Sequence, residues 1–141
     1  MILKAEGRFL EITILRRSHP ESLDFEDANW IETEIRIAVP GFNGCYGANL
    51  RTDDFSRFNN GLEQLKTFQS NEIEFTTIEE GIFLKGIIDT SGNIQWIGTA
   101  KPSYGDSCLT FTIRTDFASI DDLLYQTQDI LSNYPVVGTL S

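Results

Sequence analysis

The residue types that perform most protein chemistry are sparse in this 141-residue chain. His19 is the single histidine, and no second histidine or suitably spaced cysteine accompanies it, so a standard zinc site is not expected. Cys45 or Cys108 would act as a nucleophile only with a base and an orienting third group, and His19 is the one imidazole available. The two cysteines are also too few and too far apart for a disulfide framework. We therefore expect two free thiols, no metal and no cofactor.

Adjacent carboxylates and clustered glycines do not build a catalytic motif in this sequence either. Glu79 and Glu80 are neighbours, and neighbours on a strand point to opposite faces. Asp53 and Asp54 stand where a helix should begin, and their charge complements the positive end of the helix dipole. Residues 41–47 are glycine-rich but lack the GK[ST] ending of a phosphate-binding loop, so a turn with a bulge explains them. Enzymatic catalysis is the weakest of the interpretations.

The distribution of acids is more informative, because the chain has 21 Asp and Glu against 11 Lys and Arg. Nucleic-acid binding through phosphate contacts needs clustered Lys and Arg, so no direct RNA or DNA binding is expected. Six acids and no base lie between Ser18 and Ile35, and 115–141 also holds acids without a base. Either stretch is ordinary solvated surface or a negative face for a basic protein partner. The residues predicted to bind such a partner are Glu21, Asp24, Glu26, Asp27, Trp30, Glu32 and Glu34.

The sequence also bears on the compartment. Lys4, Glu6 and Arg8 interrupt any apolar run near the first residue, so a secretory signal is not expected. No apolar stretch approaches the length of a membrane span. We therefore expect a soluble, cytoplasmic protein that makes no membrane contact.

The strongest structural pattern is a period-two alternation over 72–115, which predicts four short strands joined by three turns. Within it, 89–93 is a typical turn, because glycine tolerates positive φ and the polar side chains bond their own backbone. Short turns between consecutive strands favour an antiparallel meander. Further strands are predicted at 8–15, 30–39 and 42–51, and helices at 53–68 and 119–132.

These elements follow in the order βββ-α-ββββ-α and predict a single α+β domain over 1–141. Its predominantly antiparallel β-sheet should have about seven strands with two helices packed on it. No internal repeat is visible. Residues 16–29 form a long polar connection that Leu23 and Phe25 should pin to the body, and about 135–141 should form a loosely attached tail.

Apolar, glycine and acidic positions spread along the chain form a further pattern: Trp30, Gly41, Phe42, Gly44, Asp54, Phe55, Phe58, Leu62, Leu65, Glu80, Leu84, Gly92, Leu109, Phe111, Asp116 and Leu123. Their arrangement resembles the WapI-type immunity proteins of bacterial toxin–immunity systems. The resemblance implies a small cytoplasmic protein that binds a cognate toxin domain, often a nuclease, and blocks it without catalysis. A polar residue would be expected just after the position of Asp116, where this chain has Phe117.

A small-ligand carrier is the alternative from a different functional class. Its apolar pocket would lie between the sheet and a helix, near Phe83, Trp96 and Phe111. A closed, largely apolar cavity at that place would favour the carrier, and a tightly packed interior would favour surface binding.

Overall fold

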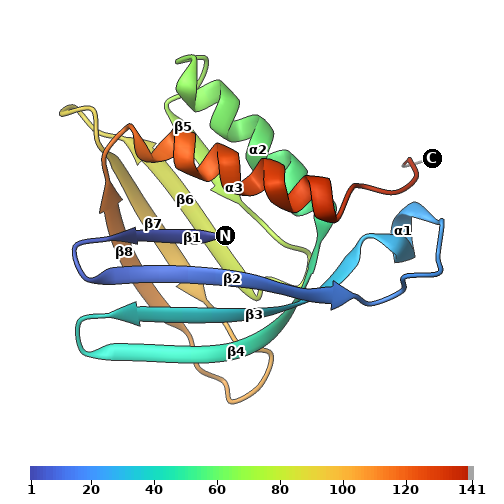
Figure 1. The fold of residues 1–141 in the computed structure, drawn as a ribbon. Coiled ribbons are helices and arrows are strands. Elements are labelled where there is room, and N and C mark those ends of the chain that lie inside the picture. Colours follow the sequence, from blue (N-terminus) through green and yellow to red (C-terminus); the bar gives the residue numbers. More distant parts are fainter. Residues whose placement is uncertain (140–141) are drawn as a thin grey trace.

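The computed structural model describes residues 1–139, which form two four-stranded antiparallel sheets and three helices (Figure 1). Sheet A consists of β1 (Ile2–Ala5), β2 (Arg8–Arg17), β3 (Trp30–Val39) and β4 (Phe42–Arg51), in that order. Sheet B consists of β5 (Glu72–Phe75), β6 (Ile82–Ile88), β7 (Ile94–Ala100) and β8 (Leu109–Thr115), also in sequence order. The helices are α1 (Phe25–Ala28), α2 (Thr52–Lys66) and α3 (Ser119–Asn133). The predicted α+β class with a mostly antiparallel sheet is confirmed.

Strand β1 and the one-turn helix α1 are the elements that the sequence pattern did not reveal, and α1 lies in the stretch expected to be a polar connection. Of the four residues of β1 only Leu3 is buried, so the strand carries almost no alternation to detect. It pairs with β2 across a two-residue turn in which Glu6 and Gly7 both have positive φ, 54° and 75°. A turn of that kind matches the right-handed twist of the flanking strands. The total is therefore eight strands in two sheets.

The two halves of the chain repeat the same architecture although the sequence shows no repeat. Each half is a four-stranded meander followed by a 15-residue helix, α2 after sheet A and α3 after sheet B. The two helices lie side by side and antiparallel (Figure 1). Lys66 Nζ meets a carboxylate oxygen of Asp121 at 2.7 Å, and the Thr127 hydroxyl donates to Asn59 Oδ1 at 2.7 Å. Both contacts fix the register of one helix against the other.

Aromatic rings fill the space between sheet B and α2. The ring of Phe58 lies 5.3 Å from that of Phe75 and 6.1 Å from that of Trp96, measured between centroids. Trp96 is fully buried, and its indole N–H donates to the Thr115 hydroxyl at 3.0 Å. Aromatic pairs at such distances add to the free energy of burial. The stripe Phe55, Phe58, Leu62 and Leu65 that predicted α2 is buried as expected.

Gly86 and Gly98 leave space in the core for the rings of Trp96 and Phe111. A Cβ built on Gly86 would lie 2.6 Å from Trp96 Cζ3, and one built on Gly98 would overlap the ring of Phe111. Any side chain at either position would therefore push a core ring out of place. A glycine within a strand marks such a close approach.

We predict that Gly98→Ala lowers the free energy of unfolding by about 1–3 kcal/mol, because the new methyl group overpacks the core against Phe111. Gly44→Ala is the matched control, since a Cβ at this strand glycine meets nothing within 4 Å. The control should change stability by no more than about 0.5 kcal/mol. Denaturant melts would measure both, and equal losses for the two variants would contradict this packing.

Candidate interaction surface

The connection between β2 and β3, residues 18–29, carries most of the acids predicted to bind a partner. We call it the acidic loop. Its four carboxylates are all exposed, and none forms an ion pair with any part of residues 1–139; they are Glu21, Asp24, Glu26 and Asp27. Leu23, which was expected to pin the loop, is instead 85% exposed, and Phe25 is half-buried. Leu23 therefore does not hold the loop, whereas the ring of Phe25 packs against Arg51.

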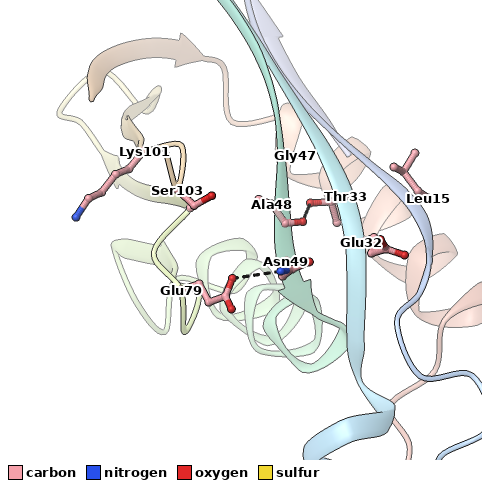
Figure 2. A pocket seen from close by; sticks show the side chains of 10 residues that line it. Leu15, Glu32, Thr33, Gly47, Ala48, Asn49, Glu79, Lys101 and Ser103 are labelled. Carbon is pink, nitrogen blue, oxygen red and sulfur yellow. Dashed lines mark hydrogen bonds between the residues drawn. The ribbon is translucent and has the colours of Figure 1, made fainter. Parts of the chain in front are cut away.

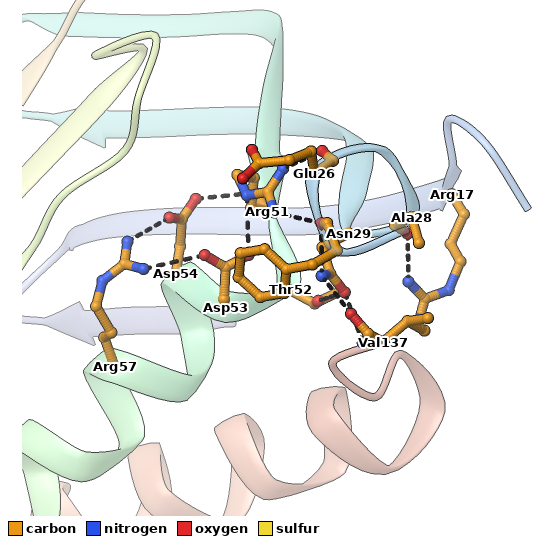
Figure 3. Close-up of polar contacts among 11 residues, drawn as sticks. Arg17, Glu26, Ala28, Asn29, Arg51, Thr52, Asp53, Asp54, Arg57 and Val137 are labelled. Carbon is orange, nitrogen blue, oxygen red and sulfur yellow. Dashed lines mark hydrogen bonds and ion pairs between the residues drawn. The ribbon is translucent and has the colours of Figure 1, made fainter. Parts of the chain in front are cut away.

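A buried guanidinium holds the loop from below (Figure 3). The Arg51 side chain is only 3% exposed, and it donates to the backbone carbonyls of Phe25 at 2.8 Å and Glu26 at 2.6 Å. Its Nε donates to a carboxylate oxygen of Asp53 at 2.9 Å. Its Cζ lies 5.1 Å from the ring centroids of both Phe25 and Trp30. Hydrogen bonds and aromatic faces thus replace the water that this charge has lost.

Asn29 closes the loop and ties it to the end of the chain. Its side-chain amide donates to the carbonyls of Phe25 and Val137, both at 3.0 Å. Its Oδ1 accepts the Val137 N–H at 2.8 Å and the Thr52 hydroxyl at 2.9 Å. All four hydrogen-bonding positions of this buried amide are therefore used.

Arg17 makes a third tie. Its guanidinium donates to the carbonyls of Ala28, at 2.7 Å, and Pro135, and it lies over the ring of Tyr134. The tail expected to be loosely attached is therefore hydrogen-bonded to the acidic loop as far as Val137. Residues 140–141 of that tail lie outside the described part of the chain.

The charges beneath the loop are satisfied among themselves. Asp54 accepts the Arg51 backbone N–H at 2.8 Å and Arg57 at 2.6 Å, while Arg57 also reaches Asp53 at 3.1 Å. Burial raises the pKa of the Asp54 carboxyl, and the hydrogen bonds from Arg51 and Arg57 offset part of that effect. The guanidinium of Arg51 is directed inward, so it leaves the exposed carboxylates of the loop available.

The other predicted residues, Trp30, Glu32 and Glu34, lie on a separate surface, the outer face of β3. Glu32 forms an ion pair with Arg16 of β2 at 3.0 Å. Trp30 is half-buried, with its ring against Arg51. Arg51, which pairs with Trp30, is buried, and the strand register places three further bases and three acids on this face. These six charges balance, and they belong to Lys4, Arg16, Arg36, Glu11, Glu32 and Glu34. The structure thus divides the six predicted acids into four unpaired ones in the acidic loop and two on a charge-balanced face of β3, where Trp30 packs on Arg51.

A cleft of about 230 Å³ lies at the free edge of β4 (Figure 2). Gly47, Ala48 and Asn49 form one wall, and loop residues that include Glu79 and Lys101 form the other. The Asn49 amide points toward Glu79 at 3.5 Å. No histidine or cysteine lines the cleft, and no group of three or more metal-ligating side chains occurs within residues 1–139. The cleft offers polar contacts without a nucleophile and base.

The region proposed for a carrier pocket is packed instead. Trp96 and Phe111 are buried against Gly86 and Gly98. Phe83 lies on the opposite face of sheet B, where it pairs with Thr99. The three aromatic residues therefore do not surround a common space.

The sequence predicted two free thiols and no membrane-spanning segment. Cys45 and Cys108 are both exposed and free. Among residues 1–139, no helix has both the length and the apolar character that crossing a bilayer requires.

The fold and the surface together define an α+β protein with a rigidly held acidic loop. The chain belongs to the immunity protein WapI-like family, whose model matches residues 1–135. This membership confirms the resemblance and points to a toxin-neutralising, binding role. No curated protein matches the chain.

Two solved structures match the chain at low sequence identity. A crystal structure of Trypanosoma bruciei MRP1/MRP2 has a TM-score of 0.52 and 14% identity, covering 92% of this chain and 77% of that one. A guide-RNA-binding protein complex bound to a gRNA has a TM-score of 0.49 and 14% identity, covering 91% and 81%. At this identity the likeness to MRP1/MRP2 concerns the fold alone.

We predict that Arg51→Met lowers the free energy of unfolding by about 3–5 kcal/mol, because two loop carbonyls and Asp53 lose a buried charged donor. Arg16→Met is the control, since Arg16 pairs with Glu32 at the surface, where the two side chains are 63% and 43% exposed. An exposed pair of that kind contributes about 0–1 kcal/mol. Denaturant melts and amide exchange of residues 25–29 would measure the effect. Equal stability of the two variants would contradict the role of Arg51.

Proposed function

We propose that this chain neutralises a toxin by placing the acidic loop on a basic surface of the toxin domain. The observation that carries the proposal is the contrast between the two surfaces. Within residues 1–139 the four loop carboxylates have no ion-pair partner, whereas the acids of β3 share a neutral face with Arg16 and Arg36. An unneutralised group of acids attracts a basic surface more strongly than a balanced one.

The way in which the loop is held supports this role. A flexible acidic segment would lose conformational entropy on binding, which weakens association. The bonds from Arg51, Asn29 and Arg17 already fix the backbone of residues 25–29. The loop therefore meets its partner in a formed shape, with the exposed Leu23 as an apolar contact at its tip.

The chemistry of the proposed partner follows from its own substrate. A toxin that cleaves nucleic acid needs clustered Lys and Arg to bind phosphates. Carboxylates on a rigid loop can occupy those side chains and exclude the substrate without any catalytic step. The net charge of −10 would further accelerate the encounter with such a toxin in the cytoplasm. Nucleic acid itself is not the proposed ligand, because this negative charge repels phosphate.

Trp30 supports the proposed interface from the edge of the acidic loop. Its ring packs on the guanidinium that carries the loop. Trp30→Ala would therefore speed dissociation of the partner both by removing a contact at the edge of the loop and by loosening Arg51.

The proposal predicts that the double variant Glu26→Lys, Asp27→Lys associates with its cognate toxin domain about tenfold or more slowly than the wild type at low salt. Glu32→Lys with Glu34→Lys is the matched control, because it reverses the same number of charges on the neutral face. Stopped-flow measurements over a range of salt would compare the variants. The wild-type rate should fall as salt rises, since charges are screened beyond about 8 Å at physiological ionic strength.

The opposite ranking would overturn the choice of surface. If reversal at Glu32 and Glu34 slowed association while reversal in the loop had no effect, the balanced face would be the interface. An association rate that changed neither with salt nor with either pair of charge reversals would contradict an electrostatic interface.

A further inference from the structure

An exposed aromatic pair marks the corner where α2 ends and α3 begins. The rings of Phe68 and Phe117 are stacked, with centroids 5.2 Å apart and planes within 2° of parallel. Phe68 is 73% exposed, so much of its surface is open to solvent. Large exposed aromatic residues are common at the centres of protein interfaces.

The backbone of Phe68 is unfavourable for its side chain. After Lys66, the Phe68 N–H donates to the Leu65 carbonyl at 3.1 Å, and the Gln69 N–H donates to the Gln64 carbonyl at 2.9 Å. This helix ending places Phe68 in the left-handed region, with φ of 59°. Glycine suits that position because any Cβ approaches the following carbonyl oxygen. Helix termination alone would therefore favour glycine over phenylalanine.

The surroundings of the pair are acidic. Asp116 precedes Phe117 directly, and Asp121 and Asp122 lie in the first turn of α3. Among the nearby bases, Lys66 is held by Asp121 at 2.7 Å and Arg114 by Asp89 at 3.1 Å. Lys4 lines a pocket with Asp116. All three carboxylates are exposed, and helix α3 contains no base. The corner therefore combines an apolar aromatic surface with an excess of negative charge.

We propose that Phe68 and Phe117 form a binding surface for arginine side chains of a basic protein partner. A guanidinium is planar and weakly hydrated, so it stacks on an aromatic face while its N–H groups reach carboxylates. A lysine ammonium is compact and strongly hydrated, and it gains less from such a surface.

This inference rests on the proposed function for the identity of the partner, and the geometry allows one partner to reach both surfaces. Asn29 of the acidic loop is bonded to Val137, just beyond the C-terminal end of α3, and the aromatic pair lies at the N-terminal end of that helix. A 15-residue helix is about 22 Å long. An interface of standard size covers roughly 800 Å² per partner, which is wide enough to span that length.

The test uses the chain alone, with the peptides acetyl-Arg-Arg-Arg-amide and acetyl-Lys-Lys-Lys-amide as probes, followed by NMR of the aromatic rings. The arginine peptide should shift the resonances of Phe68 and Phe117 and bind several-fold more tightly than the lysine peptide. Phe68→Ser with Phe117→Ser should abolish this preference. Phe42→Ser is the control, because Phe42 is 64% exposed on the β3–β4 hairpin.

Equal binding of the two peptides, or an arginine preference that persists in the double variant, would overturn the inference. Neither result would affect the proposed function, which depends on the loop carboxylates and is measured with the toxin domain. Thermal melts supply an independent check on folding. Phe68→Gly should melt a few degrees above Phe68→Ala, because only glycine relieves the left-handed backbone. A lower melting temperature for Phe68→Gly would contradict the strain on which the argument depends.

Discussion

A buried positive charge must be surrounded by hydrogen-bond acceptors, and Arg51 imposes that requirement on this fold. Its acceptors include two carbonyls of α1, a helix of one turn that is too short to be stable alone. The carbonyls at the end of a helix lack partners within it, so the guanidinium and the short helix complete one another. Because Arg51 is the last residue of β4 and precedes α2, the loop is fixed to the junction of sheet and helix.

The same network determines which charges remain for a partner. Arg51 is directed toward carbonyls and Asp53, and Arg17 is directed toward carbonyls of the loop and the tail. Neither neutralises the carboxylates above them. On sheet A, by contrast, cross-strand neighbours bring opposite charges together, as Arg16 and Glu32 show. The negative charge of the chain is therefore concentrated on loops and helices, and a rigid loop presents part of it.

The sequence predicted well which face of each strand is buried. It predicted poorly how the strands divide into sheets and which charged side chains become neighbours. Alternation at 30–39 and over 72–115 identified the buried side of each strand, because one face of an antiparallel sheet is apolar. It could not show that two sheets form, since both would have the same pattern. The acids of the loop and of β3 looked like one group because they are close in sequence. Arg16, which neutralises Glu32, is 16 residues away and becomes a neighbour only through strand pairing. The left-handed backbone of Phe68 leaves no trace in composition or periodicity.

Carboxylate footprinting can test whether the acidic loop is the surface that the toxin domain covers. Carbodiimide labelling of the chain, alone and with its toxin domain, followed by mass spectrometry, reports which acids become covered. Binding through the acidic loop predicts strong protection of its four carboxylates, which are Glu21, Asp24, Glu26 and Asp27. Labelling of Glu11 and Glu34 on sheet A should not change. Protection of Glu11 and Glu34 with continued labelling of the acidic loop would contradict binding through that loop.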